Sequence, residues 1–148
     1  MDLSGLLVQA VSSKFINIGK KEIGAMSEEG EKKKVLIVDD EPNVVRYLEM
    51  LLQDSGYKTV SALDGQKALE VAERETPALV ILDVLMPEHT GTDFFRKLRK
   101  NKILGSIPII VVSAAAGRNL VVKKPAAIFN KPIDPETFIA AVKKALNE

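Results

Sequence analysis

VLIVDDEP, residues 35–42, decides the fold, because a short apolar run leads directly into two adjacent aspartates and a turn. Three later apolar runs have the same form. They span residues 79–82, 107–112 and 126–129, and the polar residues that follow them are Asp83, Ser113 and Lys131. Short apolar runs bounded by polar or turn residues are typical of buried parallel strands. Helix-like stretches separate the runs, so we expect the strand ends to meet at one edge of a sheet.

In open α/β sheets, the carboxyl edge of the strands is where ligands bind. Asp39, Asp40 and Asp83 would bring three carboxylates to that edge, Ser113 would bring a hydroxyl and Lys131 an ammonium. Carboxylate oxygens are the ligands that hard divalent cations prefer. A lone aspartate or serine at a strand end is usually a cap or turn residue, but the combination indicates a site for a divalent cation and a phosphoryl group.

The bulk properties are those of an ordinary globular protein. The chain has 148 residues, of which 46% are hydrophobic and 28% charged, with a net charge of +1. This charge selects neither nucleic acid nor a membrane as partner. The absence of cysteine excludes disulfides and thiolate chemistry, and agrees with a cytoplasmic location. No apolar stretch approaches the roughly 18 residues of a membrane span.

Residues 35–148 show a pattern of five strand–helix repeats, which predicts a doubly wound α/β domain. We expect strands over residues 35–39, 57–61, 78–83, 107–112 and 126–130. We expect helices over about 43–55, from Asp64 to about 74, over about 92–101, and after Asp134 to the end. Gly56 is placed to terminate the first helix, and Asp64 and Asp134 are placed as N-caps.

Residues 1–34 are expected to be an extension outside that domain. Apolar residues recur at helical spacing over 1–22, and a polar, glycine-containing linker follows at 26–34. Three interpretations stay open for the amphipathic stretch: an incidental or disordered leader, a docking segment for a partner, or contact of residues 1–22 with a membrane surface.

Residues 35–148 resemble the receiver domain of two-component response regulators. The matching motifs, in order, are Asp39-Asp40-Glu-Pro, Asp83-Val-Leu-Met-Pro with Gly91, Val-Val-Ser113-Ala, and Lys131-Pro132. Each motif alone is weak, but their combination and order are specific. The resemblance implies a flavodoxin-like five-stranded parallel sheet with strand order 2-1-3-4-5. It also implies that Asp83 accepts a phosphoryl group from a histidine kinase or a histidine phosphotransfer protein.

The resemblance also assigns roles to the other residues of the site. Mg²⁺ would be held by Asp40, Asp83 and the backbone carbonyl of Leu85, with Asp39 acting through water. Lys131 would supply a positive charge and Ser113 a hydroxyl donor to the phosphoryl oxygens. The Lys131–Pro132 peptide is expected to be cis and to aim Lys131 inward.

Two positions bear on the lifetime of an aspartyl phosphate. Leu85 and Ala115 stand where related receivers often have polar side chains that orient an attacking water. Because both residues are apolar here, we expect slow self-hydrolysis. The protein would be a phosphoacceptor with weak autophosphatase activity rather than an enzyme.

The chain departs from the family pattern between Ser113 and Lys131, where only 17 residues intervene. Residues 116–125 are poor in helix formers, so we expect a shortened fourth helix. Ile128 occupies the position of the family's switching aromatic, and Phe129 should face the other way by alternation. Whether the usual serine–aromatic switch operates is therefore left open, since Phe129 can also be plain core.

We expect a stand-alone receiver, with no output domain after the closing helix, that signals to a downstream protein target. The alternative is a receiver-like interaction module that acts without phosphorylation. A haloacid-dehalogenase-type hydrolase is disfavoured, because that family needs Asp-x-Asp after its first strand and here the aspartates are adjacent. The basic residues of 96–102 are expected on a solvated face rather than against nucleic acid, and His89 is expected to be exposed.

Overall fold

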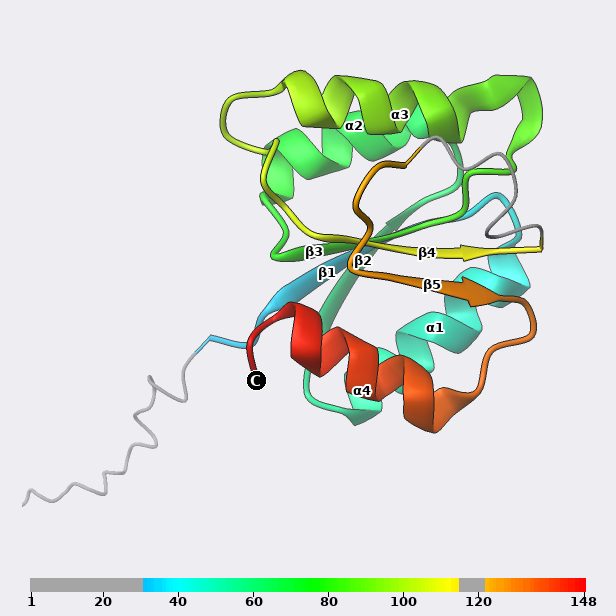
Figure 1. Ribbon diagram of the computed structural model, residues 1–148, viewed down its shortest axis with the longest axis vertical. Helices are drawn as coiled ribbons and strands as arrows, with labels where there is room; N and C mark the ends of the chain where they lie inside the picture. Colours follow the sequence, from blue (N-terminus) through cyan, green and yellow to red (C-terminus); the bar gives the residue numbers. More distant parts are fainter. Residues whose placement is uncertain (1–30, 115–121) are drawn as a thin grey trace, which may run out of the picture. The chain divides into compact units, whose positions relative to one another are not determined.

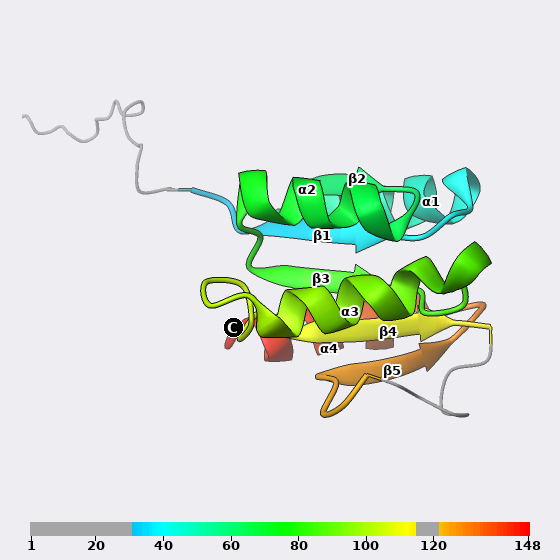
Figure 2. The same cartoon turned by 90° about the horizontal axis from the view of Figure 1, so that it is seen from above.

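The computed structural model describes residues 31–114 and 122–148, without the side chain of His89. Its five parallel strands form one sheet in the order β2-β1-β3-β4-β5, which Figure 2 shows from above. The strands are β1 (Lys34–Val38), β2 (Lys58–Ala62), β3 (Leu79–Leu82), β4 (Ile109–Ser113) and β5 (Ala127–Asn130). The expected doubly wound sheet and its strand order are confirmed.

Helices cover both faces of this sheet. They are α1 (Pro42–Asp54), α2 (Gly65–Glu75), α3 (Thr90–Lys100) and α4 (Pro135–Ala145), with a short 3-10 turn η2 (Pro87–His89) ahead of α3. Figure 1 shows α2 and α3 on one face and α1 and α4 on the other. Strands covered on both faces must be apolar throughout, which explains the uninterrupted runs in β1, β3 and β4.

The core consists of two clusters, one on each face of the sheet. In β1, Leu36 and Val38 pack in the cluster under α2 and α3, while Val35 and Ile37 pack in the cluster under α1 and α4. All four side chains are at most 1% exposed. Full burial of such a side chain is worth about 1.5–3 kcal/mol, so the two clusters fix the strand ends that hold the polar residues.

The helix ends follow the local signals. The Asp64 carboxylate accepts a hydrogen bond from the Lys67 amide at 2.8 Å, and Asp134 accepts one from the Thr137 amide at 3.0 Å. Both are the expected N-caps. Gly56 follows the last turn of α1 with a φ of +96°, a left-handed conformation that glycine adopts without strain.

The differences from expectation lie at element boundaries. β4 begins at Ile109 rather than at residue 107, because the Ile107 amide bonds Leu104 in a turn and Pro108 has no amide hydrogen. The expected short helix between β4 and β5 falls largely on residues 115–121, outside the described residues. The described part of that segment, residues 122–126, contains no helix. The expected extension covers residues 1–34, of which 1–30 lie outside the described residues. Its last residue, Lys34, is the first residue of β1.

Among the residues that the structure describes, no helix combines the length and the apolar character needed to cross a bilayer.

Candidate functional site

The polar residues predicted from the sequence meet at the carboxyl edge of the sheet. Asp39 follows β1, Asp83 follows β3, Ser113 ends β4 and Lys131 follows β5, and these strands are neighbours in that order. Carboxylate oxygens of Asp39, Asp40 and Asp83 lie within 4.8 Å of one another. Asp39 and Asp83 are only 2% and 4% exposed, so two of the three carboxylates of this acidic cluster are buried.

Lys131 brings a positive charge into the acidic cluster. Its Nζ lies 2.9 Å from Asp39 Oδ2 and 3.1 Å from Asp83 Oδ2. Its backbone amide donates to the Ser113 carbonyl at 3.2 Å, which continues the alignment of β5 with β4. The Lys131–Pro132 peptide is cis, as expected. The inward position predicted for the Lys131 ammonium is confirmed.

The two buried carboxylates are oriented by their own loops. Asp39 Oδ1 accepts a hydrogen bond from the Glu41 amide at 2.9 Å, and Asp83 Oδ1 accepts one from the Leu85 amide at 2.9 Å. Both contacts span two residues, the geometry of an Asx turn. Each aspartate therefore has one oxygen held by backbone and the other on the Lys131 ammonium.

Burial and charge act in opposite directions on these groups. Burial raises the pKa of Asp39, and the nearby Asp83 charge adds to this, while the Glu41 amide and Lys131 lower the pKa without cancelling the rise. For Lys131, burial lowers the pKa, but hydrogen bonds to Asp39 and Asp83 outweigh burial and raise the pKa above its ordinary value. The acidic cluster thus has one ammonium, on Asp39 and Asp83, for its three carboxylates.

The donor set fits a hard divalent cation. Three carboxylates supply only oxygen ligands, and their mutual repulsion is relieved by a doubly charged ion. The Leu85 side chain is 55% exposed, and its amide is committed to Asp83. Whether the Leu85 carbonyl also binds a metal stays a prediction.

The Ser113 hydroxyl is the unusual group of the site. It is completely buried, and Oγ has no hydrogen-bond partner among the described residues. A buried polar group without a partner costs about 1–3 kcal/mol. A ligand that supplied an acceptor oxygen here would recover that energy.

Two contacts of the site were missed by sequence reasoning. The Glu41 carboxylate lies 3.2 Å from Lys131 Nζ at the exposed rim, and its position directly after the acidic pair was the available signal. Gly91 packs against the Asp83 loop, where an added Cβ would lie 2.7 Å from the Asp83 carbonyl oxygen. Gly91 was noted only as part of a motif, because such a close approach depends on where α3 begins.

β5 places its two large apolar side chains on opposite faces. Ile128 is 41% exposed, whereas Phe129 packs edge-to-face on Phe138 of α4, with ring centroids 5.7 Å apart. The predicted opposite orientation of Ile128 and Phe129 is confirmed, and Phe129 belongs to the core under α4. Ala115 and the side chain of His89 lie outside the described residues, so the expectations about them stay predictions.

Comparison with known proteins places this geometry in a family. The model of the response regulator receiver domain matches residues 35–143. Protein Rrf1 of Nitratidesulfovibrio vulgaris is 31% identical over 113 residues, which cover 76% of this chain and 82% of that protein. The alkaline phosphatase synthesis transcriptional regulatory protein PhoP of Bacillus subtilis is 42% identical over 82 residues, which cover 55% of this chain and 33% of PhoP.

A solved structure shows the same likeness in three dimensions. The chemotaxis protein CheY4 of Vibrio cholerae superposes with a TM-score of 0.71 at 29% identity, over 78% of this chain and 100% of that one.

Proposed function

The chain belongs to the response regulator receiver family of two-component systems, and on this premise we propose that Asp83 accepts a phosphoryl group. The donor is a histidine kinase or a histidine phosphotransfer protein in the cytoplasm. The phosphorylated protein signals through contacts with a downstream protein target. The observation that supports this most is the buried Asp83 carboxylate, which lies beside Asp39 and on the Lys131 ammonium.

The transfer needs a carboxylate nucleophile and a means to hold the incoming phosphate. An Asp83 oxygen forms a bond to phosphorus while the bond from phosphorus to the donor's histidine nitrogen breaks. The imidazole leaves as a neutral group, because its other ring nitrogen already carries a proton. Lys131 shifts its ion pair from the Asp83 carboxylate to a phosphoryl oxygen. Ser113 donates its hydroxyl to another phosphoryl oxygen, which gives the unpartnered Oγ an acceptor.

Asp39, Asp40 and Asp83 would hold Mg²⁺, together with the Leu85 carbonyl that the family resemblance implies. When bound, Mg²⁺ neutralises negative charge on the phosphoryl group. The protein's own contribution is to pre-orient the carboxylates: backbone amides hold one oxygen of Asp39 and one of Asp83 before any ligand arrives.

The aspartyl phosphate would hydrolyse slowly. Leu85 projects from the acceptor loop with 55% exposure and offers no polar group to orient water. The half-life of the purified phosphoprotein should therefore be minutes or longer. A half-life of seconds, measured by loss of the phosphoryl mass over time, contradicts this.

The proposed function is tested by incubating the protein with Mg²⁺ and acetyl phosphate and measuring its intact mass. The wild type should gain the mass of one phosphoryl group, and Asp83→Asn should gain none. Asp54→Asn, which removes an exposed carboxylate at the end of α1, is the matched control and should be phosphorylated like the wild type. A wild type that stays unmodified with several phosphodonors favours the alternative, an interaction module that acts without phosphorylation.

A further inference from the structure

A second hollow lies at the opposite edge of the sheet from the acidic cluster. It is a pocket of about 970 Å³ between the end of α3, the segment before β4 and residues 123–124 before β5. Since the strands are parallel, residues that precede β4 and β5 lie at the amino edge, while Asp83 and Lys131 lie at the carboxyl edge. The length of a five-residue strand, roughly 16 Å at about 3.3 Å per residue, separates the two edges.

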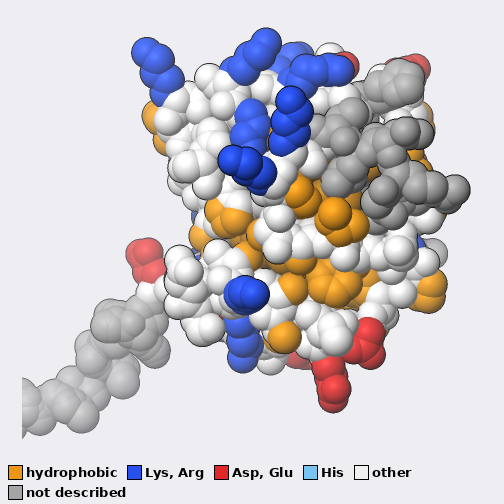
Figure 3. Space-filling view, viewed as in Figure 1, with side chains coloured by type: hydrophobic (Ala, Val, Ile, Leu, Met, Phe, Trp, Pro, Cys, Tyr) orange, Lys and Arg blue, Asp and Glu red, His pale blue; other side chains and the backbone are white. Residues whose placement is uncertain are grey.

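Positive charge dominates this pocket, which we name the basic pocket after its five cationic residues, Arg96, Arg99, Lys100, Lys123 and Lys124. Within residues 31–114 and 122–148, no acidic residue lines it. The whole chain has a net charge of only +1, so this charge is a local concentration. Figure 3 shows Lys and Arg side chains gathered over α3 and the surface beside it. Such a concave concentration of one sign attracts anions.

The lysines of the basic pocket are not neutralised within the part of the chain that the structure describes. Arg96 pairs with Asp93 of α3 at 2.9 Å. Lys100, Lys123 and Lys124 form no ion pair with any described residue. Three lysines from two separate segments therefore line one hollow without a counter-charge among the described residues.

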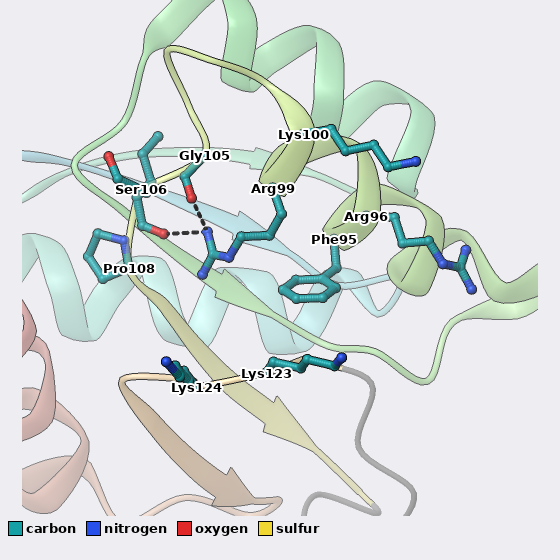
Figure 4. A pocket seen from close by; sticks show the side chains of 10 residues that line it. Phe95, Arg96, Arg99, Lys100, Gly105, Ser106, Pro108, Lys123 and Lys124 are labelled. Atoms are coloured by element: carbon teal, nitrogen blue, oxygen red, sulfur yellow. Dashed lines mark hydrogen bonds between the residues drawn. The ribbon is translucent and has the colours of Figure 1, made fainter.

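Arg99 forms a fixed wall of the basic pocket. Its guanidinium lies 5.4 Å from the centroid of the Phe95 ring. Its Nη1 donates to the carbonyls of Gly105 at 3.1 Å and Ile107 at 2.9 Å. Nε and Nη2 make no hydrogen bond to a described residue, and Figure 4 shows Lys123 and Lys124 across the hollow from Arg99. The expectation of a fully solvated face is wrong for Arg99, which is half-buried.

We propose that the basic pocket binds a small anion with two or more linked phosphate groups, from an inorganic polyphosphate or a nucleoside polyphosphate. A fixed guanidinium and mobile ammonium groups are the side chains that bind phosphate oxygens. The volume lies at the upper end of the roughly 300–1,000 Å³ typical of small-molecule pockets. Cations along a helix are also a feature of nucleic-acid sites, so the test below includes a DNA duplex. Here the cationic residues come from two separate segments and line one concave pocket.

The test is calorimetric titration of the full chain with tripolyphosphate and, separately, with ATP in Mg²⁺-free buffer containing EDTA. The variant Lys100→Gln/Lys123→Gln removes two pocket charges. The control Lys143→Gln/Lys144→Gln removes two exposed charges from α4 on the other face of the sheet. Each lost charge-assisted contact weakens binding roughly tenfold, so the dissociation constant should rise at least tenfold in the pocket variant and less than twofold in the control.

The two ligands separate the possible sources of the phosphate groups. Equal affinities for tripolyphosphate and ATP mean that the phosphate chain alone is recognised, and tighter binding of ATP means that the nucleoside adds a contact. Either result supports the site if the pocket variant weakens it. Asp83→Asn should bind both ligands like the wild type, which keeps this proposal separate from phosphorylation of Asp83.

Three results overturn the proposal. The first is no measurable binding of either ligand by wild-type protein whose circular dichroism shows it folded. The second is equal weakening in the pocket variant and the control, which would reflect net charge alone. The third is tighter, pocket-dependent binding of a DNA duplex than of tripolyphosphate, which would make the surface a nucleic-acid site.

Discussion

At the scale of single residues, the acidic cluster joins two buried aspartates through one lysine. Lys131 is within 3.1 Å of carboxylate oxygens from both Asp39 and Asp83. Removing one partner of a buried ion pair leaves an uncompensated charge, which costs far more than an exposed pair contributes. The buried charges therefore cost the folded state free energy, unless a bound ligand also interacts with them.

Ser113 gives a prediction in which stability and function change in opposite directions. Its hydroxyl is buried without a partner among the described residues, so Ser113→Ala should raise the free energy of unfolding by about 1 kcal/mol. The same change should slow phosphorylation by acetyl phosphate, because a donor to the phosphoryl group is lost. Urea denaturation and intact mass measure the two effects.

The control for this prediction is Ser61→Ala, which alters an exposed serine in β2 and should change stability by less than about 0.5 kcal/mol. A clear loss of stability in Ser113→Ala would show that its hydroxyl has a hydrogen-bond partner in the folded protein.

The main site residues could be predicted from the sequence because each follows an apolar run of its own. Asp39, Asp83 and Lys131 are placed by strand ends, and strand ends can be read from local patterns. Glu41 and Arg99 could not be assigned from the sequence. The partner of Glu41 is distant in the chain, and the partners of Arg99 are only six and eight residues away but depend on how the turn before β4 folds. Glu41 meets a lysine 90 residues away, and Arg99 bonds carbonyls of a turn whose path is set by packing.

At the scale of elements, α2 and α3 approach each other closely at Gly65. A Cβ added to Gly65 would clash with the Thr90 carbonyl oxygen, which is backbone and cannot rotate away. Thr90 begins α3, directly after the loop that follows Asp83. The start of α2 therefore constrains the position of the acceptor loop.

Gly65→Ala should lower the free energy of unfolding by about 1–3 kcal/mol, the usual cost of forcing an extra methyl group into a packed contact. The matched control is Gln66→Ala, the next residue of the same helix, which is exposed and should be neutral or slightly stabilising. Chemical denaturation of both variants decides the point. Equal stability of the two variants would mean that α2 and α3 separate without cost.

Elements were predictable where a cap, a glycine or an apolar run marks them. Asp64, Asp134 and Gly56 marked helix ends correctly through backbone hydrogen bonds and a left-handed turn. The start of β4 was placed two residues early, because Ile107 is apolar and continues the run. Its amide instead donates to the Leu104 carbonyl in a turn. This hydrogen bond depends on the tertiary structure, and an apolar pattern does not reveal it.

At the scale of the whole described domain, polar contacts join its last residue to Tyr57 and to Lys33, just before β1. The Glu148 carboxylate accepts a hydrogen bond from the Tyr57 hydroxyl at 2.7 Å and pairs with Lys33 at 3.1 Å. These contacts lower the pKa of Glu148 below its ordinary value of 4.5. Burial, and then the bond to Glu148, raise the pKa of Tyr57, so its hydroxyl stays protonated as the donor.

A carboxyl whose pKa is lowered by folding stabilises the folded state above its unfolded-state pKa, and this contribution is lost as the pH falls through the folded-state value. Glu148→Gln should therefore reduce stability at pH 7 by about 0.5–1 kcal/mol, a range that allows for solvent screening of a partly exposed group. The difference from wild type should become smaller as the pH is lowered from 7 to 3, because Glu148 becomes protonated in the folded state. Urea denaturation at both pH values measures it.

Glu73→Gln, an exposed change on α2, is the control and should match the wild type at both pH values. A stability difference for Glu148→Gln that is the same at pH 3 and pH 7 would mean that ionisation of Glu148 does not contribute.

The described domain also separates two kinds of chemistry at opposite edges of one sheet. The acidic cluster lies at the carboxyl edge, and the basic pocket lies at the amino edge. The first could be predicted because the strands that lead to it are strongly patterned. The second could not, because Lys123 and Lys124 join the basic end of α3 only after β5 has paired with β4.

The most direct test of the central claim is to locate the phosphoryl group in the folded protein. Protein treated with acetyl phosphate and Mg²⁺ is reduced with borohydride, which converts an aspartyl phosphate to homoserine, and its peptides are sequenced by mass spectrometry. We predict homoserine at position 83 alone, and none when Mg²⁺ is removed by chelation. Homoserine at Asp39, Asp40 or an exposed aspartate in place of position 83 would contradict the account.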